Sequence, residues 1–177
     1  MSKETQHIPL RQSIPLDPKK VIKKTISSVL GLFVFVGFWA VFILAAIFSV
    51  LEQVGNFFVT AGLLIMLVFI VLVVIMYLYQ QAYYNRYFYD AKDDFLIIKK
   101  GVIIPSETTL PFEKINDVYV DQDLLDRLFG LYDVHFSTAT IQSGMMAHID
   151  GLVKENAEKL RDIILKEIKK AVGKRNK

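Results

Sequence analysis

The sequence predicts a membrane α-helical hairpin followed by a β-rich α+β domain, a bent antiparallel sandwich or barrel capped by a C-terminal helix. Three patterns support this fold class. Residues 25–51 contain no Asp, Glu, Lys or Arg, and after Glu52 no such residue recurs until Arg86. Beyond Arg86, short runs rich in aromatic and β-branched residues alternate with turn signals, as strands do. From residue 153 onward, apolar residues recur at the spacing of a helix with one buried face.

The two uncharged stretches form the predicted hairpin at residues 25–82, with spans at about 26–50 and 57–79. Each exceeds the roughly 20 apolar residues that cross the hydrocarbon core of a bilayer. They could instead be two buried helices of a soluble protein, but both are apolar all round, whereas such helices normally show a polar stripe. The first stretch is also too long for the apolar region of a signal peptide, which has about 7–15 residues.

Lys and Arg are concentrated before the first span and absent from the connection at residues 51–56. Cytoplasmic flanks of membrane spans carry an excess of these residues. We therefore expect a multi-pass protein of the cell membrane with both termini in the cytoplasm. The residues that set this orientation are Arg11, Lys19, Lys20, Lys23 and Lys24.

Residues 1–24 combine basic and polar side chains with Pro9, Pro15 and Pro18, a composition that buries little apolar surface. This segment is predicted to be a flexible basic cytoplasmic arm. Its last lysines mainly determine topology, and they are also possible contacts to anionic lipid at the membrane surface. These candidate residues are Lys19, Lys20, Lys23 and Lys24.

The predicted cytoplasmic domain covers residues 83–172 and is followed by a basic tail at 173–177. We expect six or seven strands, of which the clearest are at 87–91, 95–99, 102–104 with an irregular continuation through 108–110, 115–120, 132–138 and 145–149. A short helical turn at 124–129 should stop at Gly130. The terminal helix should bury one stripe, formed by Val153, Ala157, Leu160, Ile164, Ile168 and Ala171.

The chain offers few residues for catalysis or metal binding. It has no cysteine, and its histidines are His7, His135 and His148, which lack the spacing of a zinc site. No nucleophile elbow or phosphate-binding loop is present. We therefore expect no enzyme activity, no catalytic residues, no metal site and no cofactor. Residues 83–177 carry fifteen basic and fifteen acidic side chains, so nucleic acid is not an expected partner either.

The order of several short motifs resembles the bacterial pleckstrin-homology (PH) domain of the membrane-flanked family of YdbS and YdbT type. Together with the preceding helical hairpin, the resemblance covers roughly residues 20–170. The residues that carry it are Tyr89, Asp93, Asp94, Phe95, Lys100, Gly101, Val102, Leu110, Pro111, Phe112, Glu113, Lys114, Ile115, Asp117, Val118, Leu125, Arg127, Leu128, Phe129, Gly130, Leu131, Val134, Ser137, Thr138, Ile149 and Gly151.

This resemblance implies two bent antiparallel sheets with a C-terminal helix across one open corner, and it implies no reaction. Gly101 and Gly130 fit tight turns that need a positive φ. The first hairpin loop contains Lys92 followed by Asp93 and Asp94, and these carboxylates would repel a phosphoinositide headgroup. The cations that remain as possible partner or lipid contacts are Lys99, Lys100, Lys114 and Arg127. Lys114 and Arg127 could instead pair with Asp117, Asp123 or Asp126, and that structural pairing is the favoured interpretation.

The leading hypothesis is therefore a non-enzymatic, membrane-anchored PH-like interaction or scaffold module that recruits protein partners at the cytoplasmic face. The alternative is a membrane-surface module that binds anionic lipids. A transporter or enzyme subunit is a weaker third hypothesis, because neither span contains an ionisable residue. A second membrane protein of the same family is a possible partner, and a homo-oligomer is also possible.

Overall fold

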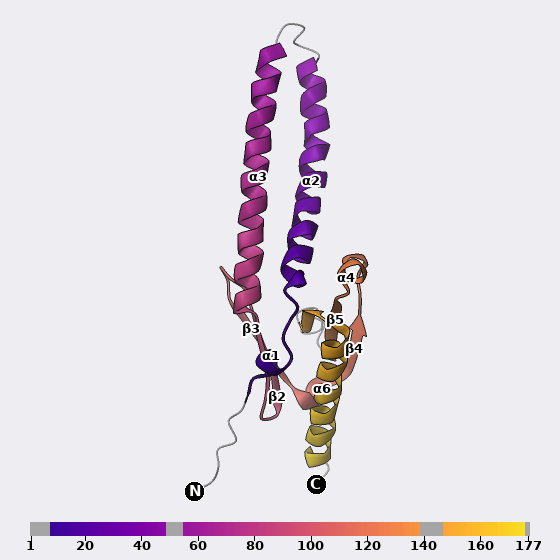
Figure 1. Ribbon diagram of the computed structural model, residues 1–177. Helices are drawn as coiled ribbons and strands as arrows, with labels where there is room; N and C mark the ends of the chain where they lie inside the picture. The colour runs from indigo at the N-terminus through magenta and orange to yellow at the C-terminus, as the bar shows by residue number, and fades with distance from the viewer. Residues whose placement is uncertain (1–7, 49–54, 139–146, 176–177) are drawn as a thin grey trace. The chain divides into compact units, whose positions relative to one another are not determined.

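A computed structural model describes residues 8–48, 55–138 and 147–175 (Figure 1). The chain forms two compact units. One, which we call the helical unit, is Val21–Gln81. The other, which we call the domain, combines Met1–Lys20 with Ala82–Lys177. The domain therefore contains chain from both sides of the helical unit.

The helical unit consists of most of α2 (Lys19–Phe48) and α3 (Gly55–Arg86). Both helices contain a stretch that is long and apolar enough to cross a membrane, at Lys19–Ala40 and Gly62–Arg86, with mean hydropathies of 1.7 and 2.9. Within the unit, the rings of Phe33 and Phe69 meet edge to face at 6.5 Å between centroids.

Both helices are longer than the predicted spans, since α2 begins at Lys19 and α3 continues to Arg86. The physical reason is that hydropathy marks where an apolar surface ends, whereas a helix continues until a residue breaks it. Neither the lysines before residue 26 nor the Gln and Tyr residues after Tyr79 break a helix. The predicted turn between the helices falls largely on residues 49–54, which lie outside the described residues.

The domain contains two antiparallel three-stranded sheets, with the orders β1-β2-β3 and β4-β5-β6. The first sheet is formed by β1 (Phe88–Lys92), β2 (Phe95–Lys100) and β3 (Ser106–Pro111). The second is formed by β4 (Ile115–Asp121), β5 (Tyr132–Thr138) and β6 (His148–Leu152). The shorter elements are α1 (Leu10–Ser13), the 3-10 turn η1 (Phe112–Lys114) and α4 (Leu124–Phe129), and α6 (Lys154–Arg175) ends the described chain.

The core lies between the two sheets and α6, because alternate strand residues face inward. Fully buried examples are Leu96 in β2, Val134 in β5 and Ile149 in β6. The predicted stripe of the terminal helix is confirmed, since Ala157, Leu160 and Ile164 are completely buried while Ile168 and Ala171 pack at the edge of the core. The helix packs against β4 and β5.

Most strand predictions are confirmed, but two boundaries differ. The first hairpin turns at Asp93–Asp94, and Gly101 and Gly130 both have positive φ, as expected. The third strand begins at Ser106 rather than at Val102, because the chain turns at Gly101. The last strand is His148–Leu152 rather than 145–149. Residues 139–146, which include the start of that predicted strand, lie outside the described residues.

The N-terminal segment differs most from its prediction. A flexible arm was expected over residues 1–24, but Leu10, Ile14 and Leu16 are buried in the core of the domain. The average composition of the segment hides these regularly placed apolar residues among its polar and basic neighbours. We refer to residues 8–20 as the arm; residues 1–7 lie outside the described residues.

The arm lies along the seam between β1 and β6, which are the edge strands of the two sheets. On the β1 side, the Leu10 amide donates to Asp90 Oδ1 at 3.1 Å, and the Tyr89 hydroxyl donates to the Ile14 carbonyl. Burial raises the pKa of Tyr89 well above its usual range, so the hydroxyl keeps its proton. On the β6 side, the Asp17 amide donates to the Gly151 carbonyl at 2.9 Å. The arm thus connects the two sheets.

A substitution in the arm tests whether it belongs to the core. Ile14 is 0% exposed, so Ile14→Ala should destabilise the domain by about 2–5 kcal/mol, the usual range for a buried Ile truncation. Ile8→Ala is the matched control, because Ile8 belongs to the same arm and is 63% exposed. The free energy of unfolding of both variants is measured by chemical unfolding of the full chain in detergent, monitored by near-ultraviolet circular dichroism. Equal stability of the two variants would show that the arm is not packed.

Candidate interaction surface

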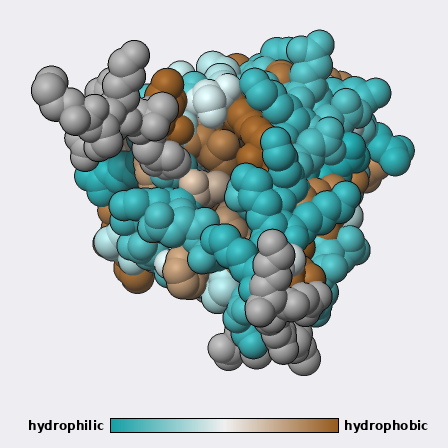
Figure 2. Space-filling model, turned by 90° about the horizontal axis from the view of Figure 1, so that it is seen from below, coloured by the Kyte–Doolittle hydropathy of each residue, from teal (hydrophilic) through white to brown (hydrophobic). Residues whose placement is uncertain are grey.

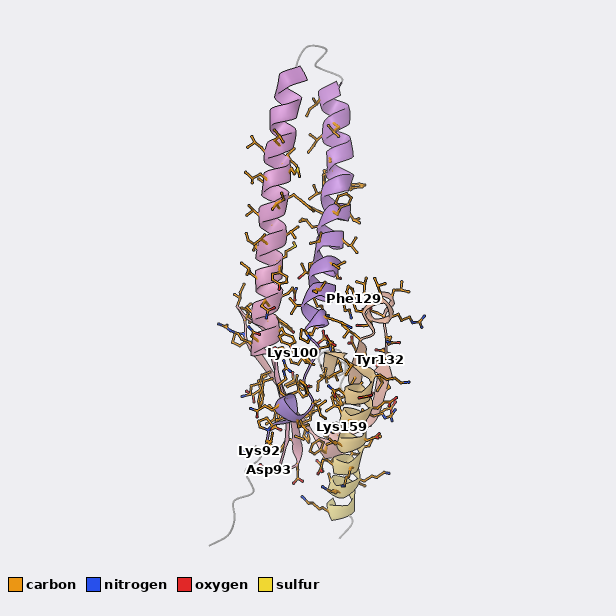
Figure 3. All side chains as sticks on the ribbon, viewed as in Figure 1. Lys92, Asp93, Lys100, Phe129, Tyr132 and Lys159 are labelled. Atoms are coloured by element: carbon orange, nitrogen blue, oxygen red, sulfur yellow. The ribbon has the colours of Figure 1, made fainter. Side chains whose placement is uncertain are left out.

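The strand pairing places two loops at the end of the domain where α2 and α3 join it. In the first sheet, Phe88 pairs with Lys99, so the β2–β3 loop lies next to the end of α3. In the second sheet, Tyr132 at the start of β5 pairs with Leu152 at the end of β6. Since α4 precedes β5, it lies at this end of the sheet. Gly151 lies here too, and it is bonded to Asp17 of the arm shortly before α2 begins. We call this the helix-proximal end. Within the domain, Figure 3 labels Lys100 and Phe129 toward one end, with Lys92 and Asp93 toward the other.

The four predicted contact cations do not converge on one site. Lys99 and Lys100 end β2 and Arg127 lies in α4, all at the helix-proximal end, whereas Lys114 lies in η1 near the β1–β2 turn. Lys99 forms an exposed ion pair with Glu107 on β3, at 3.0 Å. The ammonium group of Lys100 lies 5.4 Å from the centroid of the Tyr87 ring. A single cationic pocket is therefore not formed by these residues.

The acidic partners expected for Lys114 and Arg127 have other roles. Asp123 and Asp126 form a capping box at the start of α4, in which each carboxylate accepts a hydrogen bond from the other residue's backbone N–H. Asp117 accepts from the Val118 amide at 2.8 Å. Among the residues that the structure describes, neither Lys114 nor Arg127 forms an ion pair with these carboxylates. Both side chains are exposed.

A buried ion pair is the strongest electrostatic feature of the domain. The Lys20 ammonium group donates to Asp150 Oδ1 at 2.8 Å, and the two side chains are only 2% and 5% exposed. The same ammonium group lies 3.8 Å from the centroid of the Tyr87 ring, in cation–π geometry. Burial raises the pKa of Tyr87, and the negative charge of Asp150 raises it further. The Tyr87 hydroxyl stays protonated and donates to the His148 carbonyl at 3.0 Å.

The backbone of β6 is shaped to admit the Lys20 side chain. Gly151 has a φ of +81°, and a Cβ atom at this position would lie 2.6 Å from Lys20 Cδ. Only glycine fits both the conformation and the space. Lys20, predicted as a membrane-surface contact, is therefore a buried structural residue, and this corrects that part of the prediction. Lys23, in the helical unit, is likewise only 2% exposed, which corrects its predicted surface contact too, whereas Lys19 is exposed and Lys24 is half-buried.

Three stacked rings form a row across the second sheet. Tyr119 on β4 stacks on His135 on β5 at 5.0 Å between centroids, and His135 stacks on His148 on β6 at 5.4 Å. His135 Nε2 lies 3.1 Å from Asp121 Oδ1. We call these residues the aromatic row. No group of three or more His, Asp or Glu side chains within the described ranges is arranged to hold a metal ion.

Comparison with protein families identifies the type of domain. A family model described as Bacterial PH domain matches residues 27–168, which include most of both long helices, both sheets and most of α6. The chain belongs to the bacterial PH domain family. The part of the resemblance that concerns a bacterial PH domain is thereby confirmed. Comparison with curated proteins gives no match. Comparison with solved structures gives none either.

The bacterial PH domain also has an open pocket of about 500 Å³ beside the β1–β2 turn. It is lined by Phe95, Pro111 and Ala171 and bordered by Asp94, Glu113 and Lys174. Lys174 donates to Asp94 at 2.7 Å, and this hydrogen bond raises the pKa of the Lys174 ammonium group. Figure 2 views the molecule from below and shows hydrophobic areas within a mostly hydrophilic surface.

Breaking the buried ion pair of the PH domain should be far more costly than breaking an exposed one. Lys20→Met removes the ammonium group and leaves the buried Asp150 carboxylate without that countercharge, which should cost about 3–5 kcal/mol. Lys99→Met is the matched control, because its exposed pair with Glu107 should contribute about 0–1 kcal/mol. Chemical unfolding of the full chain in detergent measures the free energy of unfolding of both variants.

A double variant completes this test. In Lys20→Met with Asp150→Asn, both charges are gone, so the loss should be smaller than the sum of the two single losses. Strictly additive losses would mean that the two groups do not interact.

Proposed function

We propose that this bacterial PH domain protein is a non-enzymatic interaction module that is anchored in the cell membrane and recruits protein partners at the cytoplasmic face. The observation that carries the proposal is the exposed apolar surface of α2 and α3. In the most apolar part of the Gly62–Arg86 stretch, no residue is buried. In the most apolar part of the Lys19–Ala40 stretch, 17% of the residues are buried. A core helix of a soluble protein would be mostly covered.

The cost of leaving these helices in water supports a bilayer as their environment. Leu63, Leu67 and Val71 in α3 are each about half exposed or more, as are Phe35 and Trp39 in α2. Each fully exposed side chain of this size forgoes about 1.5–3 kcal/mol of burial free energy. An apolar surface that extends along two long helices is far larger than soluble monomers tolerate.

The way the helices join the domain supports a single orientation. Lys19 and Lys20 start α2 inside the domain, and Ala82–Arg86 end α3 inside the same domain. Two spans that leave and re-enter one domain place both of its segments on one side of the membrane. The lysines before the first span, together with a connection that lacks Lys and Arg, favour the cytoplasm as that side.

The aromatic row is the surface that best suits a protein partner. Aromatic side chains are enriched at protein interfaces because they bury a large area with little loss of conformational freedom. Tyr119 is 46% exposed, and stacking on His135 holds its ring in one orientation. A second membrane protein of the same family, or a second copy of this chain, would be held near this surface by the bilayer, which raises its effective concentration.

The anchor is tested by placing charge in the apolar helix. Leu67→Lys with Val71→Lys should strongly reduce membrane insertion, because each lysine at the centre of a span costs about 2.5–3.5 kcal/mol. Val172→Lys is the control, since Val172 is an exposed apolar residue of α6 in the domain. Alkaline carbonate extraction of membranes measures the retained fraction. A native chain recovered in the soluble fraction would refute the anchor.

Partner recruitment is tested by crosslinking in membranes followed by purification of the chain. We expect the native chain to recover a discrete protein partner, and Tyr119→Ala with His135→Ala to lose most of it. Glu158→Ala with Lys159→Ala, which alters exposed residues of α6, should leave recovery unchanged. Consistent recovery of the native chain alone would count against a recruiting role.

The alternative function is binding of anionic lipids. The observation in its favour is that Lys99, Lys100 and Arg127 all lie at the helix-proximal end. Charge neutrality of residues 83–177 and the ion pair between Lys99 and Glu107 weaken this alternative. The lipid-binding alternative predicts that the domain contacts the membrane surface only when the lipid headgroups are anionic.

A further inference from the structure

Four apolar side chains at the helix-proximal end are exposed to an unusual degree. Ile103 and Ile104 in the β2–β3 loop are 80% and 82% exposed, and Leu124 and Leu128 in α4 are 84% and 76% exposed. We call these four residues the apolar rim. No other large apolar residue described in the domain exceeds the 63% exposure of Ile8. The rim thus places apolar groups where a soluble surface would have polar ones.

Both parts of the rim are held by defined backbone structure. Gly101 has a φ of +103°, and a Cβ atom there would lie 2.2 Å from the Ile104 carbonyl oxygen, so the loop makes a turn that only glycine allows. The guanidinium group of Arg86 donates to the Val102 carbonyl at 2.7 Å and connects the loop to the end of α3. In α4, the capping box at its start and Gly130 at its end fix the short helix. The apolar side chains are therefore presented by ordered elements.

The β2–β3 loop is held by a residue of α3 that lies beyond the end of the predicted span. The predicted span ends near Tyr79, and Arg86, which contacts the β2–β3 loop, lies seven residues further along the helix. At 1.5 Å per residue this is about 10 Å beyond the end of the span. Amphipathic segments that lie in the interface bury their apolar side chains about 5–10 Å into the boundary of headgroups and acyl chains. The loop is thus at a depth where such burial is possible.

The charged groups near the rim suit a lipid interface. Arg86, Lys99 and Lys100 flank the loop, and Arg127 lies between Leu124 and Leu128 of α4. The nearby carboxylates are engaged within the domain: Glu107 with Lys99, Asp121 with His135, and Asp123 and Asp126 in the capping box. Long cationic side chains beside apolar residues are typical of segments at membrane interfaces, because their heads reach the polar layer.

We propose that the apolar rim inserts into the headgroup boundary of the same bilayer that α2 and α3 cross, so that the domain rests on the membrane through four points of apolar contact. This inference rests on the proposed membrane anchor. The occupant is lipid rather than protein because the rim consists of two separate elements, because Arg86 at the end of α3 holds one of them, and because both are flanked by cations. Insertion is driven by apolar contact and therefore occurs with neutral headgroups too.

Single-cysteine labelling tests this proposal, and the absence of native cysteine makes each label unique. Ile104→Cys and Leu128→Cys carry a spin label in the full chain, reconstituted in phosphatidylcholine vesicles. The label is probed by collision with oxygen, which concentrates in lipid, and with a water-soluble nickel chelate. We expect oxygen-to-nickel collision ratios several-fold higher at both rim positions than at Lys92→Cys, a control at the opposite end of the domain. Ile103→Cys and Leu124→Cys repeat the test should either first variant misfold.

The outcomes separate this proposal from the anchor on which it rests. A label at Leu67→Cys in α3 reports whether the chain is in the bilayer at all. Lipid exposure at residue 67 with water exposure at residues 104 and 128 overturns the rim insertion alone, whereas water exposure at all three overturns the anchor. Rim labels shielded from both reagents would show a protein occupant, and spin–spin broadening would show a second copy; either overturns lipid insertion. Insertion that needs anionic vesicles would support the alternative function and contradict the apolar mechanism.

Discussion

The ion pair between Lys20 and Asp150 is the interaction on which closure of the domain depends. An ammonium group and a carboxylate that are almost fully buried stabilise a fold only if they stay together, since either alone would be strongly destabilising. This pair joins the first turn of α2 to β6, and the Tyr87 ring beside it belongs to the segment that leads from α3 into β1. One contact therefore connects the arm, both sheets and the starting point of one apolar helix.

The arm shows why this contact is needed. Two three-stranded sheets leave an open seam between β1 and β6, and the arm fills it with Leu10, Ile14 and Leu16. Hydrogen bonds from Asp17 to Gly151 and from Asn156 to Pro15 fix the arm on the β6 side. The bacterial PH domain of this chain is thus completed by residues that precede the helical unit. A fragment that begins after α3 would lack part of its own core.

Local patterns were sufficient to predict the two long apolar helices, the first hairpin, α4 with its glycine stop and the buried stripe of α6. They failed where the outcome depended on residues distant in sequence. Lys20 reads as a surface lysine because nothing near it indicates a partner 130 residues away. The high exposure of Ile103 and Leu124 was not predicted, because hydrophobicity alone cannot distinguish a buried strand or turn from an exposed one. His135 and His148 come together only through the register of β5 and β6.

The sequence separation within the domain has a consequence for its biosynthesis. Chains grow at about 5–20 residues per second, so Lys20 leaves the ribosome on the order of 10 s before Asp150 exists. During that time the apolar residues of the arm have no seam to fill, although α2 and α3 have already been synthesised. The domain can therefore close only as the last step of synthesis, and the nascent arm with its exposed Ile14 and Leu16 is the segment that a chaperone would meet first.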